Sequence, residues 1–327
     1  MPKNIKLFSE VSIEMEQFRI GHSDPIFLLG SCFTENMGKR LEELNFQSMM
    51  NPFGILYNPL SMATALYYCM EDRRVGEEDL VFRDDLWHSW LHHGSFSRRD
   101  KQECLDTCNQ TISDAHIFLQ TCNTVIITFG SAWYYQLSDN YQSSIPNHQF
   151  PKIVANCHKV PAAYFKKHLA TVDQVVEAWS PLVDGLMKRG TRIIFTISPV
   201  RHNAYGAHGN QLGKAVLLLA IEKLISRYRN PDNSDQDSTF PSWANTKSEY
   251  RILDSQLAYF PAYEIVVDEL RDYRFYADDM AHPSPLAEQI VWQRFQETFM
   301  TQDTIDRCND YEKTNRRNAH RPIHGNS

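Results

Sequence analysis

The residue types needed for nucleophilic acyl chemistry occur in two short stretches of the chain. Ser31 follows an apolar run, residues 26–29, and Gly30, whereas Asp279 and His282 lie three residues apart near the other end. A serine nucleophile needs an imidazole to take its proton and a carboxylate to hold that imidazole. At this spacing, Asp279 could accept from Nδ1–H of His282 while Nε2 faces Ser31. Taken alone, these residues leave a helix-capping role for Ser31 and a chance Asp–His pair as open alternatives.

Short apolar runs alternate with helical patterns along the chain, which predicts an α/β fold with a central parallel sheet and helices on both faces. In such a sheet every turn that follows a strand opens onto the same edge, so Ser31, Gly54, Gly130, His202 and the Asp279–His282 stretch would meet there. The strands are expected at residues 26–29, 47–50, 124–129, 191–198 and 262–267, and the helices at 33–44, 60–70, 104–119, 172–188, 214–228 and from 285 onward.

Three segments interrupt this pattern and are predicted as inserted loops or hairpins, near residues 75–100, 134–161 and 229–248. The first is rich in Trp, His and Phe with partial alternation of apolar and polar residues, which indicates a hairpin or an irregular insertion. Residues 1–300 are expected to form a single domain, and the polar tail at 301–327 is expected to fray.

Composition excludes several classes of protein. With 42% hydrophobic residues in 327, the chain can bury a sizeable core, and a formal charge of −7 gives no basic footprint for nucleic acid. No apolar run is long enough to span a membrane, and the first twenty residues lack a secretory signal pattern. The seven scattered cysteines do not form a disulfide framework or a metal motif. We therefore expect a cytoplasmic protein with no nucleic-acid or membrane partner. The sequence does not indicate an oligomeric state.

Several motifs together resemble one known family. The runs LGSCFTENMGKRLEELNF, NPFGILYNPLS, HSWLHHGSFS, VANCHK, TISPVRH and YFPAYEIVVDELRDYRFYADDMAHPSP occur in this order. They resemble the GSCFA family, within the wider SGNH (GDSL-like) hydrolase superfamily, over residues 18–299. One departure is Thr34, where the family name spells alanine.

The resemblance implies a flavodoxin-like three-layer sandwich with a catalytic triad of Ser31, Asp279 and His282, and no metal or organic cofactor. It also implies an oxyanion hole that contains the N–H groups of Ser31 and Gly54. The third block of the wider group carries an oxyanion asparagine, but this chain has Ala132 at that place. The candidate replacement donors are Asn156, Asn51 and His202, and we favour Asn156.

Further side chains could line a substrate pocket, because aromatic and imidazole groups together can hold a polar, partly apolar ligand such as a sugar. An ordinary amphipathic hairpin remains the alternative for those in the first insertion. Cys32 is intrinsically the better nucleophile, but its side chain should turn away if Ser31 faces the site. The pocket candidates are Cys32, Asn51, His88, Trp90, His92, Gly130, Trp133, His158 and His202.

These expectations combine into a serine esterase of the SGNH type. It would hydrolyse a short acyl ester, with acetyl as the expected group, on a carbohydrate or a similar polar small molecule. An O-acyltransferase that uses the same triad is one alternative. A catalytically weak glycan-binding protein is another, and Ala132 favours it.

Overall fold

The computed structural model describes residues 9–13, 18–138, 153–229 and 256–319. The insertion predicted at 229–248 therefore lies outside the described residues except at its first residue. The middle part of the insertion predicted at 134–161 lies outside them as well.

A central sheet of five parallel strands confirms the predicted α/β class. If these strands are numbered along the chain, their order in the sheet is 2-1-3-4-5, so the chain reverses its direction of travel between β1 and β5. Four of the five predicted strands are confirmed to within a few residues. The strands are β1 (Ile26–Gly30), β2 (Ser48–Met50), β5 (Thr124–Phe129), β9 (Arg192–Ile197) and β10 (Leu257–Phe260).

The fifth strand was predicted wrongly at residues 262–267. The strand there is β10, which ends before Pro261, and the chain then coils into α7 (Ala262–Glu264) and a π-helical turn, Ile265–Leu270. The N–H of Ile265 donates to the carbonyl of Pro261 at 3.0 Å, so the apolar run after Pro261 makes helical instead of strand hydrogen bonds.

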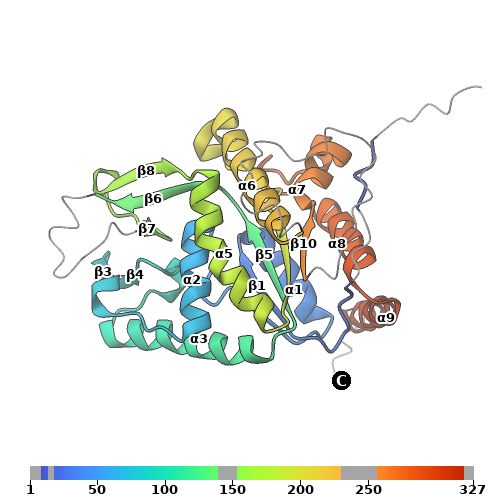
Figure 1. Ribbon diagram of the computed structural model, residues 1–327, viewed down its shortest axis with the longest axis horizontal. Coiled ribbons are helices and arrows are strands. Elements are labelled where there is room, and N and C mark those ends of the chain that lie inside the picture. The colour runs from blue at the N-terminus through green and yellow to red at the C-terminus, as the bar shows by residue number, and fades with distance from the viewer. Residues whose placement is uncertain (1–8, 14–17, 139–152, 230–255, 320–327) are drawn as a thin grey trace, which may run out of the picture.

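Helices cover both faces of the sheet and make three layers (Figure 1). Strand residues alternate between the faces: Phe27 and Leu29 pack with one set of helices, and Ile26 and Leu28 with the other. The first set is α2 (Pro59–Glu71), α3 (Lys101–Thr121), α5 (Val172–Lys188) and α6 (Gly206–Arg229). The second set is α1 (Cys32–Glu43), α7, α8 (Pro285–Phe299) and α9 (Gln302–Ala319).

One small antiparallel sheet lies within the first predicted insertion, and a second overlaps the segment predicted at 134–161 but extends beyond it to residue 169. The predicted hairpin is confirmed as β3 (Leu80–Arg83) paired with β4 (Leu86–Ser89). The second sheet has the order β7-β6-β8, with β6 (Trp133–Leu137), β7 (Ile153–Val154) and β8 (Phe165–Leu169). Short 3₁₀ helices occur at Glu77–Asp79, Gly94–Phe96, Ala162–Tyr164, Asn203–Tyr205 and Tyr273–Phe275.

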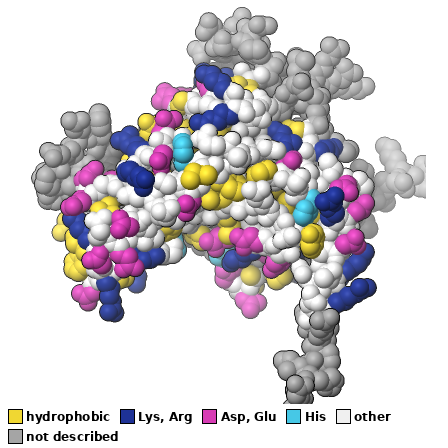
Figure 2. All heavy atoms as spheres, turned by 90° about the horizontal axis from the view of Figure 1, so that it is seen from below, with side chains coloured by type: hydrophobic (Ala, Val, Ile, Leu, Met, Phe, Trp, Pro, Cys, Tyr) yellow, Lys and Arg dark blue, Asp and Glu magenta, His cyan; other side chains and the backbone are white. Residues whose placement is uncertain are grey.

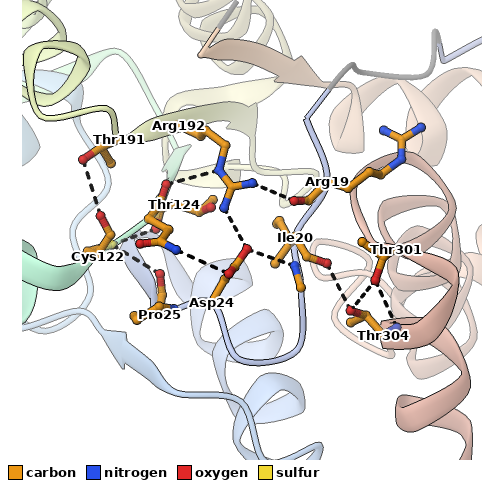
Figure 3. A network of polar contacts seen from close by, with 12 residues as sticks. Arg19, Ile20, Asp24, Pro25, Cys122, Thr124, Thr191, Arg192, Thr301 and Thr304 are labelled. Carbon is orange, nitrogen blue, oxygen red and sulfur yellow. Dashed lines mark hydrogen bonds and ion pairs between the residues drawn. The ribbon is translucent and has the colours of Figure 1, made fainter.

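The segment before β1 is fixed to the amino edge of the sheet by the guanidinium of Arg192 (Figure 3). Arg192 donates to Asp24 at 2.8 Å and to the carbonyl oxygens of Arg19 at 2.6 Å and Asn123 at 3.3 Å. Burial raises the pKa of Asp24, but the hydrogen bonds from Arg192, Gly21 and Asn123 and the charge of Arg192 together outweigh this effect and leave the pKa lowered. The ion pair is therefore held in a partly desolvated place, opposite the edge at which the strands end.

The C-terminal tail was predicted wrongly as a segment that frays, because residues 302–319 form α9 and pack on the domain. Cys308 is fully buried, Thr304 donates to the carbonyl oxygen of Ile20 at 3.2 Å, and the ring of Tyr311 stacks on His22 at 5.5 Å. The buried side chains lie on one narrow stripe of α9, and the rest of this helix is mostly charged or polar. The stripe is too narrow to be recognised as an apolar helical pattern in the sequence.

The surface carries a mixture of charges. On the face shown in Figure 2, acidic and basic side chains are interspersed around a band of hydrophobic ones. Within the described parts of the chain, no helix has the length and apolar character needed to cross a bilayer.

Candidate active site

The turn after β1 brings the chain close to β5. A Cβ added to Gly30 would lie 2.4 Å from the carbonyl oxygen of Thr128 and 2.5 Å from Oγ1 of Thr34. Ser31 then caps α1 in an extended conformation, with φ −79° and ψ −175°, and Cys32 is the first helical residue. Glycine at position 30 therefore allows β1 to run directly into the start of a helix beside β5.

Cys32, and not Ser31, faces the imidazole of His282. Sγ of Cys32 lies 3.5 Å from Nε2 of His282, whereas Ser31 is fully buried and its Oγ has no hydrogen-bond partner among the described residues. The expectation that Cys32 turns away from the site is wrong. Successive residues at a helix start point about 100° apart, so only one of the two neighbours can face the loop that carries His282.

The Asp279–His282 loop holds the imidazole by three hydrogen bonds to one carboxylate. Oδ2 of Asp279 lies 2.5 Å from Nδ1 of His282, and Oδ1 accepts from the N–H groups of Ala281 and His282, each at 2.9 Å. Met280 adopts the left-handed conformation, with φ 57°, which lets both N–H groups converge on Asp279.

These contacts determine which nitrogen of His282 carries the proton. The N–H of His282, the N–H of Ala281 and the imidazole lower the pKa of Asp279 to about 2. An ionised carboxylate can only accept, so the proton of the neutral ring lies on Nδ1. Nε2 is thereby left free to accept a proton from the thiol of Cys32.

The thiol of Cys32 is influenced by opposing electrostatic effects. Burial raises its pKa, while the N–H groups of Phe33 and of Cys32 itself, at the start of α1, lower it. The charge of Glu35 raises this pKa further and that of Lys214 lowers it. The thiol therefore depends on its polar neighbours to ionise.

The loop after β5 completes this edge of the sheet, at the point where the strand order reverses. The N–H groups of Gly130 and Ser131 both donate to the carbonyl oxygen of Tyr57 at 2.9 Å, and Ala132 is fully buried. Ligands of open α/β sheets bind outside the strand ends at such a reversal point. Cys32, after β1, and Gly130, after β5, therefore lie on either side of the position at which a ligand is expected to bind.

His202 lies beside this loop. Its ring makes an edge contact with that of Tyr57, with 5.6 Å between ring centroids, and its Nε2 is buried with no hydrogen-bond partner among the described residues. Burial, assisted by the charge of Lys214, lowers the pKa of His202 to about 3. His202 is therefore neutral at physiological pH.

Of the other oxyanion candidates, Gly54 uses its N–H within its own loop, whereas Nδ2 of Asn51 is buried with no hydrogen-bond partner among the described residues. The N–H of Gly54 donates to the carbonyl of Asn51 at 2.7 Å, and Oδ1 of Asn51 accepts from the N–H of Gly30 at 2.8 Å. Asn156 lies in the insertion after β7, where its Oδ1 accepts from the N–H of His158 at 2.9 Å. The structure thus brings Asn51 to the turn before Cys32, while Asn156 belongs to the insertion.

The pocket candidates of the first insertion pack mainly against one another and their surroundings. His88 stacks on His158 at 4.6 Å, and His92 stacks on Phe53 at 4.1 Å. Trp90 and His92 are fully buried, and burial lowers the pKa of His92 to about 3 and that of His158 to about 4. These four side chains therefore form a packed cluster beneath the hairpin, in which His92 and His158 are neutral near pH 7.

Two residues at the sheet edge were missed from the sequence. The carbonyl oxygen of Tyr57 accepts the hydrogen bonds from the loop after β5, and Lys214 is buried in α6, with 1% of its surface exposed. A signal for Lys214 was present: it lies three residues before Leu217 and seven before Ile221, both buried, and hence on the core face of a strongly apolar helix. Trp133, which was predicted, stacks on Tyr205 at 5.4 Å beside the same loop.

Comparison with known families settles the relationship of the chain. The sequence model of the GSCFA family matches residues 25–295. The chain belongs to the GSCFA family. The matched span of this GSCFA protein contains both the turn that carries Cys32 and the loop that carries Asp279 and His282. No curated protein matches it.

Proposed function

We propose that this GSCFA protein is an acyl-ester hydrolase in which the thiol of Cys32 is the nucleophile, His282 the general base and Asp279 the residue that orients the base. The observation that carries the proposal is the linear arrangement of Sγ, imidazole and carboxylate, with 3.5 Å and 2.5 Å between the successive heavy atoms. A nucleophile, a base and an orienting group in this order constitute a nucleophilic triad.

The proposal moves the nucleophile by one residue from the serine expected from the sequence. A buried hydroxyl with no partner, as in Ser31, cannot pass its proton to His282 without a change in the turn. Ser31 serves instead as the residue before the first turn of α1, whose N–H groups lie at the electropositive end of the helix. These N–H groups can stabilise negative charge on sulfur and on the substrate oxygen.

The reaction balances with the chain's own groups and water. The S–H proton of Cys32 passes to Nε2 of His282, and the thiolate attacks the acyl carbon to form a C–S bond. Collapse of the tetrahedral intermediate breaks the ester C–O bond, and the alcohol leaves with the proton held by His282. Water then attacks the carbonyl carbon of the thioester and gives a proton to His282. The C–S bond breaks, the sulfur of Cys32 takes the proton from His282, and the carboxylic acid leaves.

Exposure of the dyad favours hydrolysis over acyl transfer. The side chains of His282 and Asp279 are 48% and 51% exposed, so water can reach the thioester beside them. An acyltransferase has to exclude water from this intermediate. The packed cluster beneath the hairpin offers no open aromatic wall, so the proposal rests on the acyl carbonyl and leaves the alcohol part of the ester open.

The finer fold assignment belongs to the same proposal. The strand order 2-1-3-4-5 is that of flavodoxin-like doubly wound sheets. Together with a nucleophile after the first strand and an Asp–His loop before α8, it supports membership of the SGNH hydrolase superfamily.

The decisive experiment measures p-nitrophenyl acetate hydrolysis by the full chain and by three alanine variants. Cys32→Ala should lower turnover by about 10³-fold or more, the scale expected for removal of a triad nucleophile. Ser31→Ala should retain most of the activity. Acid quenching during turnover, followed by peptide mapping, should find the acetyl group on Cys32.

The matched control is Cys157→Ala, which removes another partly buried thiol, in the insertion after β7. It should leave turnover unchanged. Undiminished turnover in Cys32→Ala, or an acetyl group found on Ser31, would overturn the assignment of the nucleophile. Failure of the wild-type chain to form any covalent adduct would favour a binding protein instead.

A further inference from the structure

A buried lysine lies at the reversal point of the sheet. Lys214 enters from α6, and its Nζ donates to the carbonyl oxygens of Gly130 at 2.7 Å and Ser198 at 2.6 Å. These two residues directly follow β5 and β9. Lys214 thereby joins the carboxyl ends of two neighbouring strands directly beside the turn that carries Cys32.

Lys214 approaches the position where the wider hydrolase group carries its oxyanion asparagine. The preceding residue, Gly213, packs against the loop after β5, since a Cβ added there would lie 3.5 Å from the backbone nitrogen of Ala132. With a methyl side chain at Ala132, the polar group that reaches this region comes from α6 and not from the loop itself.

Burial of the charged Lys214 side chain is energetically unfavourable, whereas burial of an apolar side chain would not be. It is fully buried, and among the described residues no carboxylate lies within ion-pair distance of Nζ. An ammonium in such a place is poorly compensated by two carbonyl oxygens alone. Burial accordingly lowers the pKa of Lys214 to about 7, so a substantial fraction is charged near neutrality.

The charges of Lys214 and Cys32 act on each other. Lys214 lowers the pKa of the Cys32 thiol, and a negative charge on Cys32 raises that of Lys214. Other polar groups around the pair are Glu35 of α1, Tyr57 after β2, His202 after β9, Tyr263 of α7 and His282 before α8. Of these, Glu35 opposes ionisation of the thiol and His282 pairs with the thiolate.

We propose that Lys214 is a positioning residue whose buried ammonium supports negative charge at Cys32, first on the thiolate and then on the tetrahedral intermediate. It would thus supply through space part of the stabilisation that an oxyanion asparagine supplies by contact. This inference rests on the proposed role of Cys32. A purely structural tie between the ends of β5 and β9 is the competing explanation, and it needs only the two hydrogen bonds.

The test is the pH dependence of Cys32 alkylation by iodoacetamide, followed by peptide mapping in the full chain. Lys214→Gln keeps an amide that can donate to both carbonyl oxygens but removes the charge, and Lys214→Met removes both. Both variants should lower the rate of Cys32 alkylation about tenfold at pH 6, where Lys214 of the wild type is mostly charged, and should leave the rate above pH 9 unchanged, where Lys214 is neutral. If Lys214→Gln alkylates as the wild type does, the charge has no role and the proposal is overturned.

Lys223→Met is the matched control, because Lys223 lies on the same helix but is exposed and paired with Asp173. It should leave the rate of Cys32 alkylation at pH 6 unchanged. His282→Ala tests the proposed function separately: if it does not alter Cys32 alkylation, the triad fails, whereas an effect of His282→Ala without one of Lys214→Gln overturns only the present inference.

Discussion

Substitution of Gly30 by alanine should both lower the free energy of unfolding and displace the turn that carries Cys32. The new Cβ would lie 2.4 Å from the carbonyl oxygen of Thr128, where an ordinary contact is at least 3.4 Å, so β1 and β5 would have to separate locally by about 1 Å. The obstacle is backbone, and no rotation of a side chain relieves it. Overpacking costs about 1–3 kcal/mol, and we expect the upper end of this range, about 3 kcal/mol.

The free energy of unfolding is measured by urea titration with circular dichroism. Gly94→Ala is the matched control, since a Cβ added there meets nothing within 4 Å, and its effect should stay within about 0.5 kcal/mol. The Gly30→Ala midpoint should fall well below that of the control, with the urea dependence unchanged. Equal midpoints for the two variants would refute the argument that β1 and β5 are in contact at this turn.

Three further predictions address other parts of the chain. Asp279→Asn should leave the fold intact but reduce ester hydrolysis by up to about 10⁴-fold, because the amide no longer holds the proton of His282 on Nδ1; unchanged kcat would contradict this role. Arg192→Met should lower the free energy of unfolding by about 1–3 kcal/mol, measured by urea titration, since it removes the charged partner of the partly buried Asp24 and the side-chain donor to the carbonyl oxygen of Arg19. Burial lowers the pKa values of His92 to about 3 and His158 to about 4, while an unfolded histidine titrates near 6.5, so the unfolded state binds more protons between these values. The free energy of unfolding should therefore fall as pH is lowered from 6.5 to 5, by up to about 1.4 kcal/mol per pH unit for each ring, and a flat profile over this window would show that the rings are not buried.

The central strands and most helices could be predicted because their signals are local. The run Thr124–Phe129 is apolar throughout, as a strand covered on both faces must be, and this pattern needs no knowledge of the rest of the chain. The strand Leu257–Phe260 was missed because the apolar residues continue past Pro261 into a helical turn, so only the proline marks the change. The helix α9 was missed because few of its side chains are buried.

The two stretches that meet at the candidate site were found from the sequence, but the residue that faces His282 was not. Both stretches, around Ser31 and around His282, were found because their residue types are those of acyl chemistry. The choice between Ser31 and Cys32 depends on the rotation of α1 about its axis relative to the loop before α8, and this is a tertiary property. The contacts of Lys214 are a tertiary property as well, because they depend on how α6 packs against the ends of β5 and β9.

The partial exposure of Cys32 has a consequence for the chemical durability of the protein. A partly exposed thiol beside an imidazole at a helix start can be oxidised by peroxide, at a rate that depends on the fraction of the thiol that is ionised. Oxidation to the sulfenic acid would block the nucleophile reversibly, and further oxidation to the sulfinic acid would block it permanently. Activity at this site would therefore reflect the redox history of the protein as well as its substrate.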